Sequence, residues 1–147
     1  MIRDFIMTDY EKFMELSNKM YHSDASSHTV PPEHFTKTFE MIMRGSPIVR
    51  GLMLLYDNQP AGYCQLSFTH STEAGGLVVW IEEIYIDEAF RGKGLGTELF
   101  SFLEQEYKGL AARFRLEIMP SNTGARRLYE RLGFSVCDYI PMIRELN

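Results

Sequence analysis

The sequence contains few cysteines and no long hydrophobic run, and each shortage argues against a class of protein. Cys64 and Cys137 are its only cysteines, they stand far apart, and no CxxC pair occurs. Neither a zinc knuckle nor a disulfide scaffold is expected, and both thiols are predicted to be buried. The longest apolar runs, such as residues 52–56 and 77–81, are far shorter than the about 20 residues that a membrane span requires. We expect no membrane partner and, since residues 1–4 do not resemble the start of a signal peptide, a cytoplasmic protein.

Positive charge is also scarce. The chain has 15 Lys and Arg against 20 Asp and Glu, a net charge of −5 at pH 7, and an isoelectric point near 5.4. No nucleic-acid partner is expected, because binding to phosphates requires a basic face. Hydrophobic residues make up 45% of the 147 positions, which is enough for a core, and no repeat or linker divides the chain. The sequence therefore predicts one domain over residues 1–147.

Hydrophobic periodicity and turn residues predict an α/β fold. Helical spacing favours four helices, over about residues 9–21, 32–44, 95–103 and 121–132. Apolar runs and alternation favour strands over about residues 1–7, 48–56, 61–70, 77–87 and 114–119, with one or two more over 134–146. Two tight turns in a row join the middle strands into an antiparallel meander. We expect a mixed, mostly antiparallel central sheet flanked by helices, with a polar loop over residues 22–30.

A glycine-rich turn, Arg91-Gly92-Lys93-Gly94-Leu95-Gly96, lies between a predicted strand and a predicted helix. Alternate glycines let the backbone approach a ligand closely, and the amides at a helix N-terminus favour an anion. The spacing does not fit a dinucleotide GxGxxG, because Thr97 and Leu99 stand where a glycine is required, and no Walker loop occurs. The turn predicts a phosphate or pyrophosphate site, and a solvated strand-to-helix turn is the alternative.

A second motif, residues 117–134, follows the turn by about one helix and one strand and reads EIMPSNTGARRLYERLGF. Together with residues 82–87, EEIYID, which lead into the glycine turn, it resembles the GNAT superfamily of acetyl-CoA-dependent N-acetyltransferases. The matching stretch covers residues 80–134, and the order of elements in the rest of the chain fits the same fold.

The resemblance implies acetyl-CoA as co-substrate; the spacing of the cysteines and histidines predicts no metal. The resemblance places the pyrophosphate of coenzyme A on the backbone amides of the glycine turn. It places the pantetheine arm between the strand ending near Asp87 and the strand starting near Phe114, where it pairs with main-chain groups like an added strand. Asn122 would hydrogen-bond the arm, or cap a helix, or do both. The cofactor-binding residues implied in this way are Ile84, Tyr85, Ile86, Arg91, Gly92, Lys93, Gly94, Leu95, Gly96, Thr97, Asn122 and Tyr129.

Tyr129 lies about two helical turns after Asn122 and on the same face. The resemblance implies that its hydroxyl donates a proton to the sulfur of coenzyme A. A phenol with a pKa near 10 hydrogen-bonds a departing thiolate with a pKa near 8.5, although full transfer is uphill by roughly 2 kcal/mol in water. The alternative is an aromatic residue at the edge of the core.

Two adjacent acids, Glu82 and Glu83, are candidate general bases. An amine with a pKa near 10.4 is almost fully protonated at pH 7, so its neutral form costs about 4.6 kcal/mol and a carboxylate can take the proton. As neighbours on a strand the two acids are expected on opposite faces, Glu82 with Ile84 and Glu83 with Tyr85. Similarity to the spermidine/spermine acetyltransferases of the superfamily favours Glu82 as base and Glu83 as substrate contact or second choice. Two solvated acids are the alternative.

These features predict transfer of the acetyl group by direct attack of a primary amine, since neither cysteine has a visible activator for a covalent intermediate. The acids gathered over residues 82–88 favour a small cationic acceptor, such as a polyamine or an aminoglycoside. Acetylation of a protein N-terminus or lysine, and a noncatalytic acyl-CoA-binding module, are the alternatives. The four histidines show no metal-ligand spacing, and a homodimer is left open as the assembly state.

Overall fold

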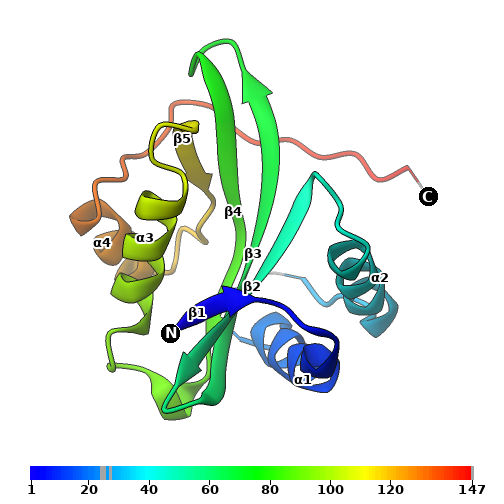
Figure 1. Cartoon of the computed structure of the whole chain (residues 1–147). Helices are drawn as coiled ribbons and strands as arrows, with labels where there is room; N and C mark the ends of the chain where they lie inside the picture. Colours follow the sequence, from blue (N-terminus) through cyan, green and yellow to red (C-terminus); the bar gives the residue numbers. More distant parts are fainter. Residues whose placement is uncertain (24–25, 27, 147) are drawn as a thin grey trace.

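A five-stranded sheet forms the centre of the computed structural model, which describes residues 1–23, 26 and 28–146 (Figure 1). Its strands are β1 Ile2–Asp4, β2 Val49–Tyr56, β3 Gln59–Ser71, β4 Gly76–Ile86 and β5 Ala111–Leu116. They lie in the order β1-β2-β3-β4-β5, antiparallel up to β4 and parallel between β4 and β5. The prediction of a mixed, mostly antiparallel sheet is confirmed.

Helices cover both faces of the sheet. The helices are α1 Tyr10–Tyr21 and α2 Pro32–Met43 on one face, and α3 Leu95–Glu106 and α4 Thr123–Arg131 on the other, with 3₁₀ turns η1 Met7–Asp9 and η2 Glu88–Phe90. All four predicted helices are present, and none of those described is long and apolar enough to cross a membrane. The loop predicted over residues 22–30 includes residues 24, 25 and 27, which lie outside the described part of the chain.

Two apolar clusters attach the helices to the sheet. The cluster beneath α1 and α2, here called the α1 side, includes Phe13, Leu16, Phe35, Phe39, Tyr63 and Tyr85. The cluster beneath α3, the α3 side, includes Cys64, Leu66, Val79, Ile81, Leu99 and Leu103. Alternation along β3 explains the division, because successive side chains of a strand point to opposite faces.

A β-bulge in β4 changes the direction of the two acids. Gln65 of β3 pairs with Glu83, but the next residue of β3, Leu66, pairs with Ile81, so Glu82 is the extra residue. Glu82 Oε1 accepts a hydrogen bond from Ser67 at 2.5 Å, and Ser67 follows Leu66, which packs on the α3 side. Glu82 therefore lies on the α1 side together with Glu83. The expectation of opposite faces is wrong, because regular alternation ends at a bulge.

Strands β4 and β5 separate before β4 ends. Their last pair is Ile81 with Leu116, whereas β4 continues to Ile86. The backbone edge of residues 82–86 is consequently not covered by β5. The predicted separation between these two strands is confirmed, although β5 begins at Ala111 rather than near Phe114.

The chain after α4 forms no strand in the part described, so the strands predicted over residues 134–146 are wrong. Phe134 packs against Phe100 and Tyr129, but residues 136–146 are exposed. Figure 1 shows this segment passing behind the sheet and ending beyond α2. The composition of the segment favours a strand, yet a strand also needs a partner for its backbone groups, and no described strand supplies one.

Candidate active site

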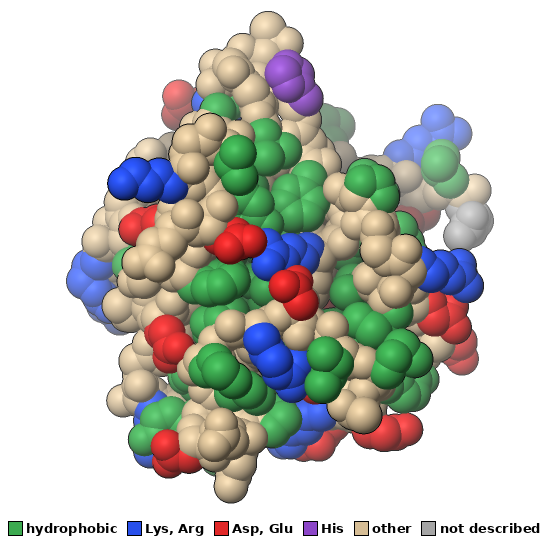
Figure 2. Space-filling view, in the orientation of Figure 1, with side chains coloured by type: hydrophobic (Ala, Val, Ile, Leu, Met, Phe, Trp, Pro, Cys, Tyr) green, Lys and Arg blue, Asp and Glu red, His purple; other side chains and the backbone are tan. Residues whose placement is uncertain are grey.

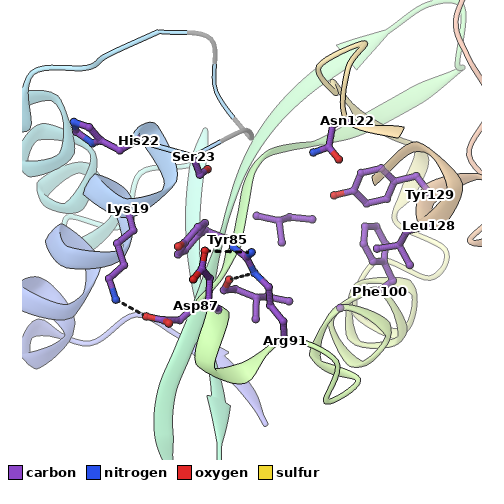
Figure 3. A pocket seen from close by; sticks show the side chains of 14 residues that line it. Lys19, His22, Ser23, Tyr85, Asp87, Arg91, Phe100, Asn122, Leu128 and Tyr129 are labelled. Atoms are coloured by element: carbon purple, nitrogen blue, oxygen red, sulfur yellow. Dashed lines mark hydrogen bonds and ion pairs between the residues drawn. The ribbon is translucent and has the colours of Figure 1, made fainter. Parts of the chain in front are cut away.

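A cleft of about 760 Å³ lies around the end of β4, with the end of α1 on one side and helices α3 and α4 on the other (Figure 3). The predicted residues that line it are Ile84, Tyr85, Ile86, Arg91, Gly96, Asn122 and Tyr129. The other predicted members of the glycine turn, Gly92, Lys93, Gly94, Leu95 and Thr97, adjoin the cleft without lining it. Glu82 and Glu83 directly precede its β4 wall. The structure thus brings both sequence motifs to one cleft.

The glycine turn leads into the first turn of α3. Gly92 and Gly94 have φ values of 75° and 81°, so backbone geometry alone explains these two glycines. No such constraint applies to Gly96, where an added Cβ would meet no atom within 4 Å. The first hydrogen bond of the helix joins the Glu98 amide to the Gly94 carbonyl at 3.0 Å. The backbone amides before Glu98 in the first turn have no acceptor within the helix. Amides without partners at the start of a helix are able to bind an anion.

The two basic side chains of the turn are held by other groups. Arg91 Nε donates to the Ile86 carbonyl at 3.0 Å, and its guanidinium lies 5.7 Å from the centre of the Tyr85 ring. Lys93 Nζ lies 5.0 Å from the centre of the Tyr56 ring. Arg91 is therefore part of the wall of the cleft, while Lys93 is turned toward β2. Of the two basic side chains, only Arg91 lines the cleft.

Asn122 both caps α4 and faces the cleft. Its Oδ1 accepts from the Ala125 amide at 3.1 Å, which is the cap predicted from the sequence. Figure 3 shows its side-chain amide on the cleft side, opposite the end of β4. The amide nitrogen keeps its donors for a ligand in the cleft.

Tyr129 reaches the same space from α4. Its ring packs edge-on against Phe100 and Phe134, with centroids 5.8 and 5.9 Å apart. Figure 3 shows the hydroxyl pointing into the cleft, where it bonds to no described residue. Burial raises the pKa of Tyr129 to about 12, with a further contribution from Cys64. The hydroxyl is therefore protonated at neutral pH and available as a donor.

Glu83 is clamped by two tyrosines on the α1 side. Its Oε1 accepts from the Tyr63 hydroxyl at 2.7 Å and its Oε2 from the Tyr21 hydroxyl at 2.7 Å. Burial raises the pKa of Glu83, the neighbouring Glu82 raises it further, and the two tyrosine hydrogen bonds oppose the change. Glu82, in contrast, is exposed and bonded to Ser67. The surroundings of Glu83 thus enhance the basicity of its carboxylate.

Sequence reasoning missed three side chains of the site, Lys19, Tyr21 and Tyr63. Lys19 Nζ lies 2.7 Å from Asp87 Oδ2 and joins the end of α1 to the end of β4; this ion pair lowers the pKa of Asp87. Tyr63 had a detectable signal, since alternation along β3 places it on the same face as Gln65, the neighbour of Glu83. Lys19 and Tyr21, at the end of α1, had no signal in the sequence, because only tertiary packing brings the end of this helix to β4.

The cysteines offer no nucleophile to the site. Cys64 is completely buried, as predicted, and burial raises the pKa of its thiol far above the usual value. Cys137 is exposed, contrary to the prediction, because the segment that contains it has no covering element. Among the described residues, no cluster of His, Cys, Asp and Glu is able to hold a metal ion.

Comparison with known proteins identifies the family. The model of the acetyltransferase (GNAT) family matches residues 10–134. The chain belongs to the acetyltransferase (GNAT) family. The matched range includes the glycine turn, strands β4 and β5, and α4 with Tyr129.

Individual relatives are more distant. The GNAT chain is 41% identical over 58 residues to the spermine/spermidine N(1)-acetyltransferase of Bacillus subtilis, a match that spans 38% of each protein. It is 24% identical over 128 residues to the [ribosomal protein bS18]-alanine N-acetyltransferase of Haemophilus ducreyi, covering 78% of this chain and 88% of that protein. Among solved structures, AAC(6')-Iy in complex with the bisubstrate analogue CoA-S-monomethyl-acetylneamine superposes with a TM-score of 0.81 at 19% identity. That superposition covers 99% of this chain and 97% of the other, and supports the fold.

The residues present fit the acetyl-CoA that the family uses. The first turn of α3 offers amides beside Gly96, where no atom of the chain occupies the space of a side chain. The edge of β4 beyond Ile81 is open to a peptide-like arm. Asn122 and Tyr129 face that edge from α4 across the cleft. Residues of the first turn of α3, of the end of β4 and of α4 thus line one cleft.

Proposed function

We propose that the protein is an N-acetyltransferase that moves the acetyl group of acetyl-CoA to a primary amine by direct attack. The observation that carries the proposal is the single cleft in which the amides of α3, the open edge of β4 and the Tyr129 hydroxyl converge. The two cysteines support direct transfer, because Cys64 is completely buried and the exposed Cys137 does not line the cleft, so neither offers a thiol for an acyl-enzyme.

Glu83, rather than the Glu82 favoured from the sequence, is proposed to take the proton of the acceptor amine. The amine loses its proton to Glu83, directly or through water, and its nitrogen then forms a bond to the acetyl carbonyl carbon while the carbon–sulfur bond breaks. Glu83 has a raised pKa and is oriented by Tyr21 and Tyr63. Glu82, exposed beside it, attracts the cationic substrate.

Tyr129 is proposed to stabilise the departing thiolate with a hydrogen bond. With a tyrosine pKa of about 12 against about 8.5 for a thiol, full proton transfer is uphill by roughly 5 kcal/mol before any change in the thiol itself. Donating a hydrogen bond avoids that cost and still stabilises the developing charge. After the nitrogen–carbon bond forms, the nitrogen loses its second proton to solvent, and the thiolate takes up a proton from solvent or from protonated Glu83 as the products leave.

For the acceptor we favour a small cationic amine of the polyamine or aminoglycoside type. Glu82 and Glu83 place two carboxylates on the α1 side, and the ring of Tyr21 is stacked on Phe35 at 5.5 Å next to them. Carboxylates and aromatic faces both attract ammonium groups. The spermine/spermidine relative supports the same class, although the match spans only 38% of its length.

Acetylation of a protein N-terminus is the second candidate, supported by the likeness to the ribosomal-protein acetyltransferase over 78% of this chain. A screen for acetyl-CoA-dependent thiol release over polyamines, aminoglycosides, amino acids and alanine-initiated peptides decides between the two. We expect turnover with a polyamine or an aminoglycoside. Turnover with peptides alone would establish the second candidate, and binding of coenzyme A without turnover on any amine would indicate a noncatalytic module.

A further inference from the structure

The end of β4 divides the cleft into two halves. In one half, here called the α4 half, Asn122 and Tyr129 project from α4 toward β4 (Figure 3). In the other, the α1 half, the lining comes from the end of α1 and consists of Lys19, His22 and Ser23. The proposed acetyl transfer uses the α4 half for coenzyme A and leaves the α1 half for the acceptor.

An ion pair crosses the α1 half. Lys19 Nζ lies 2.7 Å from Asp87 Oδ2, and both residues line the cleft. Figure 3 shows the pair reaching from the end of α1 to the end of β4. The Lys19 side chain is 44% exposed, whereas the Asp87 side chain is only 14% exposed. The Asp87 carboxylate thus already holds an ammonium group in the cleft, the same group that a cationic acceptor carries.

Lys19 also has a partner outside the cleft. Its Nζ lies 3.2 Å from Glu15 Oε1, one turn earlier on α1, and Glu15 does not line the cleft. Ion pairs of exposed lysines contribute little to stability, so they are readily exchanged for other partners. An ammonium group of a ligand is therefore able to replace Lys19 at Asp87 while Lys19 keeps its contact with Glu15.

Asp87 and the proposed base Glu83 lie on one face of β4. Alternate residues of a strand share a face, and Tyr85, between the two acids, packs in the cluster beneath α1 and α2. Helix α1 contacts both acids, through Lys19 and Tyr21. Four steps of extended chain separate the acids by about 13 Å. Two ammonium groups that are roughly 8–13 Å apart would each reach one of these carboxylates with a hydrogen bond.

A broad electrostatic field is a different way to select a polycation. Figure 2 shows acidic and basic side chains interspersed with apolar ones on the face that it draws. Among the side chains drawn there, no broad acidic area gathers that would attract a polycation from a distance. Selection for a second positive charge is instead a short-range task for carboxylates within reach of the reacting amine, and Asp87 is such a carboxylate.

We propose that Asp87 binds a second ammonium group of the acceptor and that Lys19 occupies this position until the acceptor displaces it. The inference rests on the proposed acetyl transfer and narrows its acceptor to a linear polyamine. One terminal amine of the polyamine reaches Glu83 while a distant nitrogen reaches Asp87. A short amine gains nothing at Asp87 and leaves the ion pair in place, so the pair selects long polyamines over short ones.

The test is calorimetric titration with spermidine and with diaminopropane in the presence of coenzyme A, which has no acetyl group to transfer. Only spermidine is long enough to reach both Glu83 and Asp87. In Asp87→Asn the new side chain keeps an oxygen for the Ala89 amide, which donates to Asp87 Oδ1 at 3.2 Å. Spermidine should bind Asp87→Asn roughly fivefold more weakly, and Lys19→Gln roughly threefold more tightly because the competing ammonium group is gone.

Lys12→Gln is the matched control, since Lys12 pairs with the same Glu15 at 3.2 Å but does not line the cleft. Its affinity for spermidine, and the affinity of every variant for diaminopropane, should stay within about twofold of native, because exposed charges are screened. Circular dichroism should be native for all three variants.

Three results would overturn the inference. Spermidine that binds Lys19→Gln no more tightly than the native chain would show that Lys19 does not compete for the position. Native affinity of Asp87→Asn for spermidine would exclude Asp87 as a ligand of the second ammonium group. Equal changes for spermidine and diaminopropane would show a general effect of charge rather than a second site. Thiol release from acetyl-CoA is measured separately: the expected affinities without thiol release would contradict the proposed acetyl transfer and keep the ammonium site.

Discussion

Replacing Gly96 with alanine should strengthen the fold and weaken the binding of coenzyme A. The position lies in the first turn of α3, its φ is not left-handed, and the added Cβ meets no atom within 4 Å. Alanine is preferred over glycine within a helix by up to about 1 kcal/mol. For a domain of this size we expect the melting temperature to rise by roughly 1–4 °C.

The same methyl group projects into the proposed pyrophosphate site. Gly96 lines the cleft, and the amides around it are the proposed ligands of the anion. Extra atoms forced into a close-packed contact cost about 1–3 kcal/mol, which corresponds to a roughly 5- to 150-fold increase in the dissociation constant of coenzyme A. The two effects have opposite signs, so a general loss of structure cannot imitate them.

Calorimetric titration with coenzyme A and thermal unfolding measure the two quantities on the same samples. Gly124→Ala in α4 is the matched control, because it too lies near the start of a helix with open space around its Cβ, yet does not line the cleft. It should stabilise the protein similarly and leave affinity within about twofold. A stabilised Gly96→Ala protein with native affinity would refute the placement of the pyrophosphate.

Three further outcomes follow from the described contacts. Tyr129→Phe should lower kcat by roughly 10- to 1,000-fold with little change in melting temperature. The pH–rate profile of the native protein should show no alkaline limb from Tyr129 up to pH 10, since the pKa of this residue is about 12. Glu83→Gln should remove the acid limb of the kcat/KM profile, because a base with a raised pKa becomes protonated and inactive as the pH falls through that pKa. Glu82→Gln should raise KM and keep the acid limb. Loss of the acid limb in Glu82→Gln but not in Glu83→Gln would return the role of base to Glu82. Arg3→Ala leaves the buried Asp9 carboxylate without its bidentate partner and should lower the free energy of unfolding by about 1–3 kcal/mol at pH 7. Burial raises the pKa of Asp9, but the hydrogen bonds from Arg3 and the Ile6 amide outweigh burial and lower it overall. The difference in unfolding free energy between the native protein and Arg3→Ala, measured by denaturant titration, should therefore vanish as the pH falls through that lowered pKa. An equal difference at low pH would contradict this assignment.

Much of the fold was predictable because its signals are local. Pro32 at the start of α2, the Asn122 cap of α4 and the glycines before α3 each act within one turn of backbone. The lining of the cleft by Gly96 and Tyr129 follows from these elements once their order is known. Local sequence rules predict where a helix or strand begins. The arrangement of the elements around the cleft was predicted from the family resemblance.

The features that could not be predicted depend on pairing between distant segments. The bulge at Glu82 exists only relative to the register of β3, and it moves an acid to the other face of the sheet. The clamp on Glu83 requires Tyr21, whose helix is placed by packing in the cluster beneath α1 and α2. The segment after Phe134 has the composition of a strand, but composition cannot name the edge with which a strand pairs.

The unequal exposure of the two cysteines gives the native sequence one chemically addressable position. A thiol reagent should modify Cys137 and spare Cys64, whose side chain has no accessible surface and whose pKa is raised. A fluorophore attached at Cys137 would sit one residue from Val136, within the exposed segment that follows α4. Its emission would then report any contact that covers this segment, without any substitution and at a residue that does not line the cleft proposed for acetyl transfer.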